Sequence, residues 1–418
     1  MRATSVLRIL LGIEHVRVTG FEITDIGLVI DVAPTSRIPR CSGCFCKVDR
    51  LYDSYADRLW RHVDFGGMRI ELRYTTQRVD CPRCGVRVEL LPWADAMSAF
   101  TRVFEEHVAW CATRMDKTSV ATSLRIDWAT VGRIITRVVE RLGPTDRLDG
   151  LTHIGIDELS YRRYHEYVTV VIDHLSGDVV WARPGRSAAT LNEFFAQLGP
   201  ERCKRLEAVT VDLSGQYIKS ISDNAPNALL VFDRFHVQRL AHDALDQVRR
   251  AQVREAAGTD DAPAIKNTRF ALQKNPWNLT AIDRERVAAV QTANKPLYRA
   301  YLLKETLAAI LDRRQVGVAR AKLLQWIAWA ARSKLRPFAR VARTLRTYLD
   351  GILAYVATGL SNGRSEGTNG KIRTITRRAY GFHSAHSLIG MLFLCCTRVG
   401  DALMPLRNYP VRHPAHPL

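Results

Sequence analysis

Residues 207–236 read EAVTVDLSGQYIKSISDNAPNALLVFDRFH, and this stretch decides the fold of the chain. Its two short apolar segments, AVTV and ALLVF, end in Asp212 and Asp233, and the segment between them has helical periodicity. An earlier apolar segment, HIGI, ends in the same way at Asp157. Carboxylates at the ends of neighbouring strands repel one another unless cations hold them. The pattern therefore predicts a site for oxygen-preferring divalent metals such as Mg²⁺.

The elements around these aspartates follow the order β-β-β-α-β-α-β. We expect strands at 152–157, 167–173, 178–183, 207–212 and 228–233, with helices at 187–198 and 214–223. This is the order of an α/β RNase H-like fold, in which an acid on the first strand lies beside one on the fourth. Asp157 and Asp212 are therefore the predicted catalytic, metal-binding pair. Asp233 either replaces Asp212 as a ligand or orients His236 in a supporting role, and we favour the supporting role.

A long basic and helical stretch follows the fifth strand, so we expect an all-α insertion domain within the core. The predicted boundaries are 151–236 for the first part of the core, 237–360 for the insertion and 361–418 for the last part. Glu366 lies in the run SNGRSEGTNGKIRTITRR, at the start of a predicted helix. It suits a third metal ligand surrounded by cations for DNA phosphates, although surface ion pairs would also explain it. These cations are Arg364, Lys371, Arg373, Arg377 and Arg378.

Two CxxC pairs mark residues 1–95. Cys41 and Cys44 lie in RCSGC, and Cys81 and Cys84 lie in DCPRCG, which is a ligand set for structural Zn²⁺ in a zinc ribbon. The long separation of the pairs predicts an intervening hairpin that faces DNA with its arginines, Arg58, Arg61, Arg69, Arg73 and Arg78. Two alternatives remain open, namely a ligand set in which Cys46 or His62 replaces one cysteine, and unrelated reduced thiols.

Residues 96–148 have the pattern of a helix-turn-helix. Helices are expected at 101–114, 116–126 and 127–142, with Asp116 and Asp127 as N-caps. The last helix is the predicted recognition helix, with Thr130, Arg133 and Arg137 on its polar side for contact with DNA. A trihelical bundle without DNA-reading function has the same pattern.

The charge balance of the chain favours a polyanionic partner. Its 418 residues include 61 Lys+Arg against 42 Asp+Glu, a net charge of +19 at pH 7. The longest apolar run that we find, Leu388–Cys396, is about half the length that crosses a bilayer, and Arg8 and Glu14 interrupt any signal-like stretch. We therefore expect no membrane association and a cytoplasmic protein of the bacterial nucleoid, where reduced cysteines favour metal over disulfides.

Three strings carry a resemblance to a known family: IGIDELSYRRYHEYVTVVID, VDLSGQYIKSISDNAPNALLVFDRFHVQRL and SNGRSEGTNGKIRTITRRAYGF. With the ribbon and helix-turn-helix they resemble the ISL3 family of DDE transposases over nearly the whole chain. The resemblance implies Asp157, Asp212 and Glu366 as the DDE triad, beside a D-x-x-H element at Asp233 to His236.

The mechanism that fits such a site is two-metal phosphoryl transfer with Mg²⁺, or Mn²⁺ in its place. The protein would bind the terminal inverted repeats of its element, cleave there, and join the 3′-hydroxyl ends to target DNA as a homodimer or higher oligomer. One alternative is an RNase H-like nuclease that cleaves without strand transfer. The other is a non-catalytic zinc-ribbon and helix-turn-helix regulator, which the intact acids at three separated motifs argue against.

Overall fold

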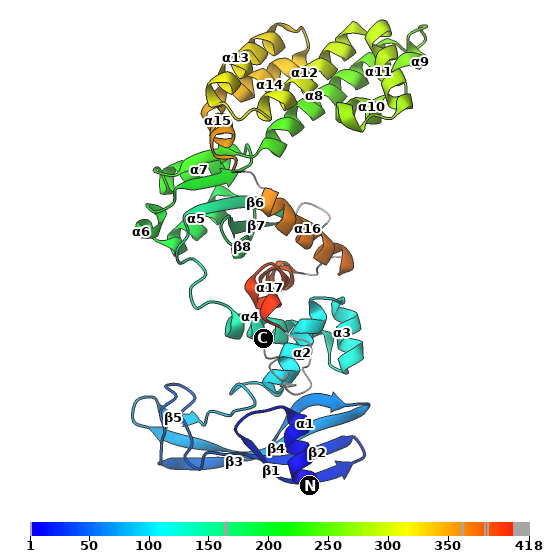
Figure 1. Ribbon diagram of the computed structural model, residues 1–418. Helices are drawn as coiled ribbons and strands as arrows, with labels where there is room; N and C mark the ends of the chain where they lie inside the picture. Colours follow the sequence, from blue (N-terminus) through cyan, green and yellow to red (C-terminus); the bar gives the residue numbers. More distant parts are fainter. Residues whose placement is uncertain (1, 163–165, 361–362, 380–381, 383, 404–418) are drawn as a thin grey trace, which may run out of the picture. The chain divides into compact units, whose positions relative to one another are not determined.

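The computed structural model describes residues 2–162, 166–360, 363–379, 382 and 384–403. The chain divides into two compact units, Met1–Thr145 together with Ile375–Leu418, and Asp146–Thr374. The helix α16, Gly363–Arg378, continues from the second unit into the first (Figure 1). The first unit therefore contains both ends of the chain.

The first unit begins with a small sheet backed by a helix. Its elements are α1 (Ala3–Leu11), β1 (Val16–Thr24), β2 (Gly27–Pro34), β3 (Leu51–Phe65), β4 (Met68–Cys81) and β5 (Gly85–Val88). The strand order is β1-β2-β4-β3, and β5 pairs with β4. The expected hairpin is present as β3 and β4, and Gly66 in the turn has φ +60°, a conformation that favours glycine. Trp60, Ile70 and Leu72 form its buried core together with Trp93.

Three helices follow, and two helices from the other end of the chain pack on them. They are α2 (Arg102–Ala112), α3 (Lys117–Leu124), α4 (Trp128–Leu142), α17 (Ala385–Cys395) and α18 (Arg398–Ala402). Asp116 and Asp127 cap α3 and α4 through their side chains, as expected. Leu394 of α17 and Val399 of α18 join the apolar core of α2 to α4. Residues from Ile375 onward therefore differ from the prediction that 361–418 completes the catalytic core.

The second unit contains a mixed five-stranded sheet. Its strands are β6 (His153–Arg162), β7 (Glu166–Asp173), β8 (Val179–Pro184), β9 (Ala208–Val211) and β10 (Leu229–Phe232), in the order β10-β9-β6-β7-β8. β7 is antiparallel to both neighbours, whereas β6, β9 and β10 run parallel. All five strands expected from the sequence are present. The parallel arrangement brings the carboxyl ends of β6, β9 and β10 to the same edge.

Helices cover both faces of this sheet. α5 (Ala188–Leu198), the short α6 (Pro200–Cys203) and α7 (Gly215–Asn224) connect the strands, and Ile156 and Val211 share an apolar core with Phe194 and Tyr217 on one face. Val170 alternates with these residues and is buried as well, on the opposite face. On α16, the hydroxyl of Thr368 donates to the carbonyl of Gly177 at 3.2 Å. The amino-terminal half of α16 thereby contacts the turn between β7 and β8.

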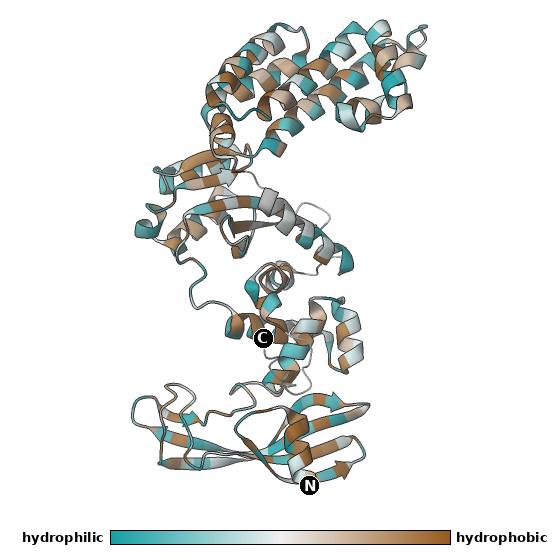
Figure 2. Cartoon of the chain, in the orientation of Figure 1, coloured by the Kyte–Doolittle hydropathy of each residue, from teal (hydrophilic) through white to brown (hydrophobic). Residues whose placement is uncertain are grey.

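A helical array leaves the sheet at β10. It consists of α8 (Arg234–Glu255), α9 (Ala262–Ile265), α10 (Arg269–Gln273), η1 (Pro276–Asn278), α11 (Ala281–Ala293), α12 (Lys295–Leu311), α13 (Val316–Arg332), α14 (Arg336–Thr347) and α15 (Leu349–Thr358). Residues 234–360 are all described and contain no strand. Figure 2 shows hydrophobic and hydrophilic residues alternating along these helices, which is typical of helices with one buried face.

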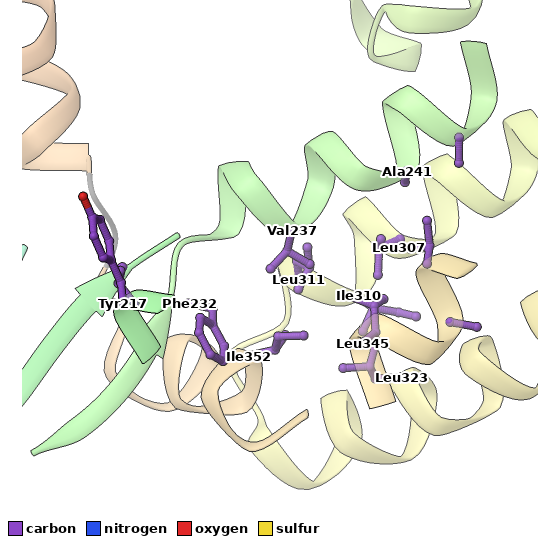
Figure 3. Close-up of a cluster of buried hydrophobic side chains, with 14 of the residues drawn as sticks. Tyr217, Phe232, Val237, Ala241, Leu307, Ile310, Leu311, Leu323, Leu345 and Ile352 are labelled. Atoms are coloured by element: carbon purple, nitrogen blue, oxygen red, sulfur yellow. The ribbon is translucent and has the colours of Figure 1, made fainter. Parts of the chain in front are cut away.

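One apolar core joins the sheet to the helical array. Figure 3 shows Phe232 at the end of β10 near Ile352 of α15, and Val237 of α8 near Leu311 of α12. The core continues to Leu345 of α14. Among the described residues, no helix combines the length and the apolar character that crossing a bilayer requires.

The contact between α15 and β10 yields a stability prediction. A Cβ on Gly351 would lie 2.4 Å from Cε2 of Phe232 and 3.2 Å from the carbonyl oxygen of Leu230. We expect Gly351→Ala to destabilise the second unit by about 1–3 kcal/mol through overpacking. The control is Gly317→Ala in α13, where nothing lies within 4 Å and the melting temperature should be unchanged or slightly higher. Equal melting temperatures for both variants would contradict this packing.

Candidate active site, zinc site and DNA-reading helices

Asp157, Asp212 and Asp233 lie at one level of the central sheet. Asp157 does not end its strand as predicted, because β6 continues to Arg162, whereas Asp212 and Asp233 directly follow β9 and β10. The parallel ladders of β6 with β9 and of β9 with β10 set Asp157 beside Asp212 and Asp212 beside Asp233. Neighbouring strands lie about 4.8 Å apart. Asp212 is therefore the middle member of a row of three acids, and it is the nearer neighbour of Asp157.

The surroundings of Asp212 disfavour its charged form. Burial raises the pKa of the Asp212 carboxyl, and the negative charge of Asp157 raises it further. The charge of His236 and the backbone N–H of Ser214 act in the opposite direction without reversing the shift. A divalent cation bound between the two carboxylates would offset their repulsion and stabilise their charged forms.

Asp233 and His236 lie next to this pair. Asp233 is only 4% exposed and directly precedes α8, and its backbone N–H donates to the carbonyl of Val211 at 3.3 Å. His236 lies one turn along α8, with Nε2 at 3.9 Å from Oδ2 of Asp233. The histidine thus interacts with both Asp212 and Asp233. This arrangement matches the expected supporting role for the D-x-x-H element, which stays a prediction.

Glu158 directly follows Asp157 within β6, so strand alternation places its side chain on the opposite face of the sheet, as expected for a structural residue. Burial raises the pKa of its carboxyl, with a further contribution from the charge of Asp212, and a hydrogen bond from Tyr217 opposes both. The Tyr217 hydroxyl also bonds to Thr169 Oγ1 at 2.8 Å. The signal available in the sequence was an acid directly after Asp157. Glu158 joins α7 to β6 and β7 beside the aspartates.

α16 carries the expected third acid and most of the expected phosphate-binding cations. Glu366 lies in the first turn of the helix, and the side chains of Glu366 and Arg364 are outside the described part of the structure. Lys371, Arg373 and Arg377 are exposed. Arg378 binds within the protein instead: its guanidinium donates hydrogen bonds to the carbonyls of Ala112 and Thr113 at the end of α2.

The two CxxC pairs come together as the sequence predicted. The sulfur atoms of Cys41, Cys44, Cys81 and Cys84 all lie within 4.8 Å of one another, and those of Cys44 and Cys81 are 3.5 Å apart. A tetrahedral zinc ion with Zn–S bonds of about 2.3 Å holds its sulfurs about 3.8 Å apart. Within the described residues no other group of three or more acids, histidines or cysteines is as compact. The four-cysteine cluster supports a structural zinc ion.

The electrostatics of the cluster also fit a bound cation. Hydrogen bonding from the backbone N–H of Arg83 lowers the pKa of Cys81 to about 7, whereas interaction with Cys44 raises the pKa of Cys84 to about 12. The thiols therefore compete for ionisation, and a cation would stabilise the thiolates together. The alternative ligand His62 is not part of the cluster, and its Nδ1 lies 2.9 Å from Thr101 Oγ1. Cys46 is not part of the cluster.

The expected DNA-contacting residues of α4 have different surroundings. Thr130 is 5% exposed and donates to the cap residue Asp127, so it does not lie on the polar side of the helix as predicted. Arg137 donates to the fully buried Glu105 at 2.8 Å. Arg133 is largely exposed and donates to Thr130 Oγ1 at 2.6 Å. Of the three residues, Arg133 is the one available to DNA.

The arginines of the β3–β4 hairpin form hydrogen bonds or ion pairs within the protein, and their contact with DNA stays a prediction. Arg58 donates to the carbonyls of Ala96 and Ser98. The other four form ion pairs, which are Arg61 with Asp64, Arg69 with Glu71, Arg73 with Asp31, and Arg78 with Asp53.

The zinc cluster yields a metal-content prediction. Wild-type protein and the matched variant Cys46→Ser should each contain one zinc ion per chain, because Cys46 lies outside the cluster. Cys81→Ser should lose the metal and lower the unfolding temperature of the first unit, since three thiolates do not close a tetrahedral structural site. Metal analysis by mass spectrometry measures both results. Zinc retained in Cys81→Ser, or lost in Cys46→Ser, would contradict the assignment.

Arg133 and Arg137 yield a prediction that separates DNA contact from stability. Arg137→Ala leaves the buried Glu105 with two partners, Arg141 at 2.9 Å and the hydroxyl of Ser98 at 2.7 Å, so we expect a loss of about 2 kcal/mol in unfolding free energy. Arg133→Ala should leave stability unchanged and weaken DNA binding. Thermal unfolding and a duplex-binding titration measure the two effects, and a reversed outcome would exchange the roles of the residues.

Comparisons with known proteins agree with these features. A transposase family model of the ISL3 type matches residues 154–392, a helix-turn-helix domain of transposase family ISL3 matches 89–139, and a zinc finger of the IS204/IS1001/IS1096/IS1165 transposases matches 37–84. The transposase for insertion sequence element IS1557 in two strains of Mycobacterium tuberculosis is 36% identical over 442 residues, covering 98% of this chain and 99% of the relative. The transposase for insertion sequence element IS1001 of Bordetella parapertussis is 29% identical over 363 residues, covering 85% and 88%. The chain belongs to the ISL3 family of insertion-sequence transposases.

Proposed function

We propose that this transposase binds the ends of its insertion sequence, cleaves the DNA there and joins the resulting 3′-hydroxyl ends to target DNA, with Asp157, Asp212 and Glu366 as its catalytic triad. The observation that carries the proposal is the common level of Asp157 and Asp212 on neighbouring parallel strands. Acids at this level of β6 and β9 are close enough to share one cation. Glu366 follows in the first turn of α16, the helix that contacts the same sheet.

The architecture of the second unit supports an RNase H-like core with a helical insertion. The strand order β10-β9-β6-β7-β8, with β7 antiparallel to the rest, fits that fold. The helices α8 to α15 stand between β10 and α16, at the position expected for an insertion domain. On this proposal, the insertion separates Glu366 from the two aspartates in sequence while α16 returns the chain to the sheet.

The donor set suits Mg²⁺, since carboxylate oxygens are its preferred protein ligands and since burial, with the neighbouring charge of Asp157, raises the pKa of Asp212. When bound, two such ions activate the attacking oxygen and stabilise the leaving 3′ oxygen of an in-line displacement. Asp157 and Asp212 would hold these ions together with Glu366. Asp233 and His236 would position Asp212, because His236 interacts with both acids.

The proposed reaction has two steps at phosphorus. Water attacks the phosphodiester at the element's end, and the 3′ oxygen leaves as a hydroxyl. That hydroxyl then attacks a target phosphodiester, whose own 3′ oxygen leaves, so no covalent protein intermediate forms. The exposed cations of α16, Lys371, Arg373 and Arg377, would hold the phosphates near Glu366. Joining two ends of one element requires at least a dimer on DNA.

The triad yields the central activity prediction. Asp157→Asn, Asp212→Asn and Glu366→Gln should each reduce cleavage and strand transfer by more than the roughly 10–100-fold typical of residues that act only through a ligand. Binding to the element's end should persist, because the reader lies in the other unit. The assay uses labelled end duplexes, Mg²⁺ and a plasmid target, with Glu201→Gln, an exposed acid on α6, as control. Wild-type rates in any triad variant would remove that residue from the triad, and cleavage without joining by the wild type would favour a nuclease.

A second prediction concerns the choice between Asp212 and Asp233. Asp233→Asn should reduce cleavage less than Asp212→Asn, because Asp212 alone is the direct neighbour of Asp157 in the sheet. His236→Ala should resemble Asp233→Asn, since the two residues act together on Asp212. Cleavage rates measured over a range of Mg²⁺ concentrations would test this, because a weakened ligand set requires more metal. Full activity of Asp212→Asn with none in Asp233→Asn would exchange the assignments.

A further inference from the structure

The segment 313–349 is unusual in its charge. It contains ten lysines and arginines and no aspartate or glutamate. All ten side chains are exposed, and they lie on α13, on α14, and in the loops before and between these helices. The segment is therefore a concentrated positive surface on the helical array.

α14 arranges four of these cations in one row. Its buried face consists of Phe338, Val341, Ala342 and Leu345, all part of the core that joins the array to the sheet. Its exposed face carries the arginine stripe, which we define as Arg336, Arg340, Arg343 and Arg346. Their spacing of four, three and three residues places them on the same side of the helix.

Several other cations of the array have acidic partners. Arg249 and Arg250 pair with Asp246 on α8, and Lys274 pairs with Asp283. Within the described residues none of the four stripe arginines forms an ion pair. Arg340 donates to the neutral Gln247 of α8 at 2.7 Å. Like-charged side chains at this spacing repel one another and destabilise an isolated helix. An external anion bound to the stripe would reduce this repulsion.

We propose that the arginine stripe binds the phosphate backbone of duplex DNA without sequence preference. Ten residues of α-helix rise about 15 Å, which corresponds to roughly four base pairs at 3.4 Å each. Four guanidinium groups along that length match a short run of phosphates, and their planar donors suit phosphate oxygens. Duplex DNA is favoured over other polyanions because the chain is a transposase with a helix-turn-helix. The stripe is a second DNA surface, separate from the acids of the sheet and from α4.

The salt dependence of binding tests the proposal. Full-length protein is titrated with a scrambled duplex in EDTA, so that no cleavage occurs, between about 50 and 200 mM salt. Replacing all four stripe arginines by glutamine should reduce the slope of log K against log salt by up to about 3.6, or 0.9 per phosphate. Across this fourfold range of salt, the wild type should lose about 100-fold more affinity than the variant.

Two further variants control for net charge and for folding. The matched variant replaces four exposed cations elsewhere in the array with glutamine, and these are Arg254, Lys266, Arg286 and Lys295. It should keep a slope close to that of the wild type. Replacing the four stripe arginines by lysine should keep most of the slope, because it preserves the charge. Circular dichroism melting curves show whether each variant folds.

Three outcomes would overturn the proposal. They are a wild-type slope in the glutamine variant, an equal loss of slope in the matched variant, and binding of the stripe to anionic phospholipid vesicles with no change in DNA binding. The test is independent of the proposed catalysis. Loss of cleavage in Asp157→Asn leaves the salt slope unaffected, and a wild-type slope in the stripe variant leaves the catalytic assignment intact.

Discussion

The structure of the catalytic unit depends on a parallel pairing of three strands that places like charges side by side. Asp157, within β6, lies level with Asp212 and Asp233, which directly follow β9 and β10, and the parallel ladders hold the three strands in register. Burial and mutual repulsion raise the pKa of Asp212, so part of the folding free energy maintains an unfavourable electrostatic arrangement. His236 limits this electrostatic cost, because its positive charge lowers the pKa of Asp212.

The positively charged side chains fall into two groups: those that bind partners within the protein and those that we propose contact DNA. The hairpin arginines and Arg137 neutralise acids of their own unit, and Arg378 binds carbonyls at the end of α2. These cations stabilise the fold and contribute little to a nucleic-acid surface. On our proposals, DNA is contacted by the exposed cations of α16, by the arginine stripe of α14 and by Arg133, whose partner Asp127 lies 3.8 Å away. Net charge alone does not distinguish the two groups.

Both ends of the chain build the unit that carries the zinc cluster and the helix-turn-helix. Leu394 and Val399 complete the core under α4, and α16 connects that core directly to the helix turn that contains Glu366. A fragment ending near residue 150 therefore lacks part of the hydrophobic cover of its recognition helix. One helix, α16, therefore belongs partly to the unit with the helix-turn-helix and partly to the unit with the proposed catalytic residues.

The sequence by itself determined the features that local pattern and spacing specify. The five strands of the second unit, the zinc ligands, the caps Asp116 and Asp127 and the family all follow from apolar periodicity, CxxC spacing and motif strings. Only the tertiary structure decided which side chains form ion pairs with residues distant in sequence, such as Arg137 with Glu105 and Arg73 with Asp31. It also decided that residues after Ile375 pack with the first unit and that Glu158 lies near Asp212. The physical reason is that hydrophobic periodicity reports which face of an element is buried, whereas ion pairs and domain contacts depend on what the folded chain brings opposite that face.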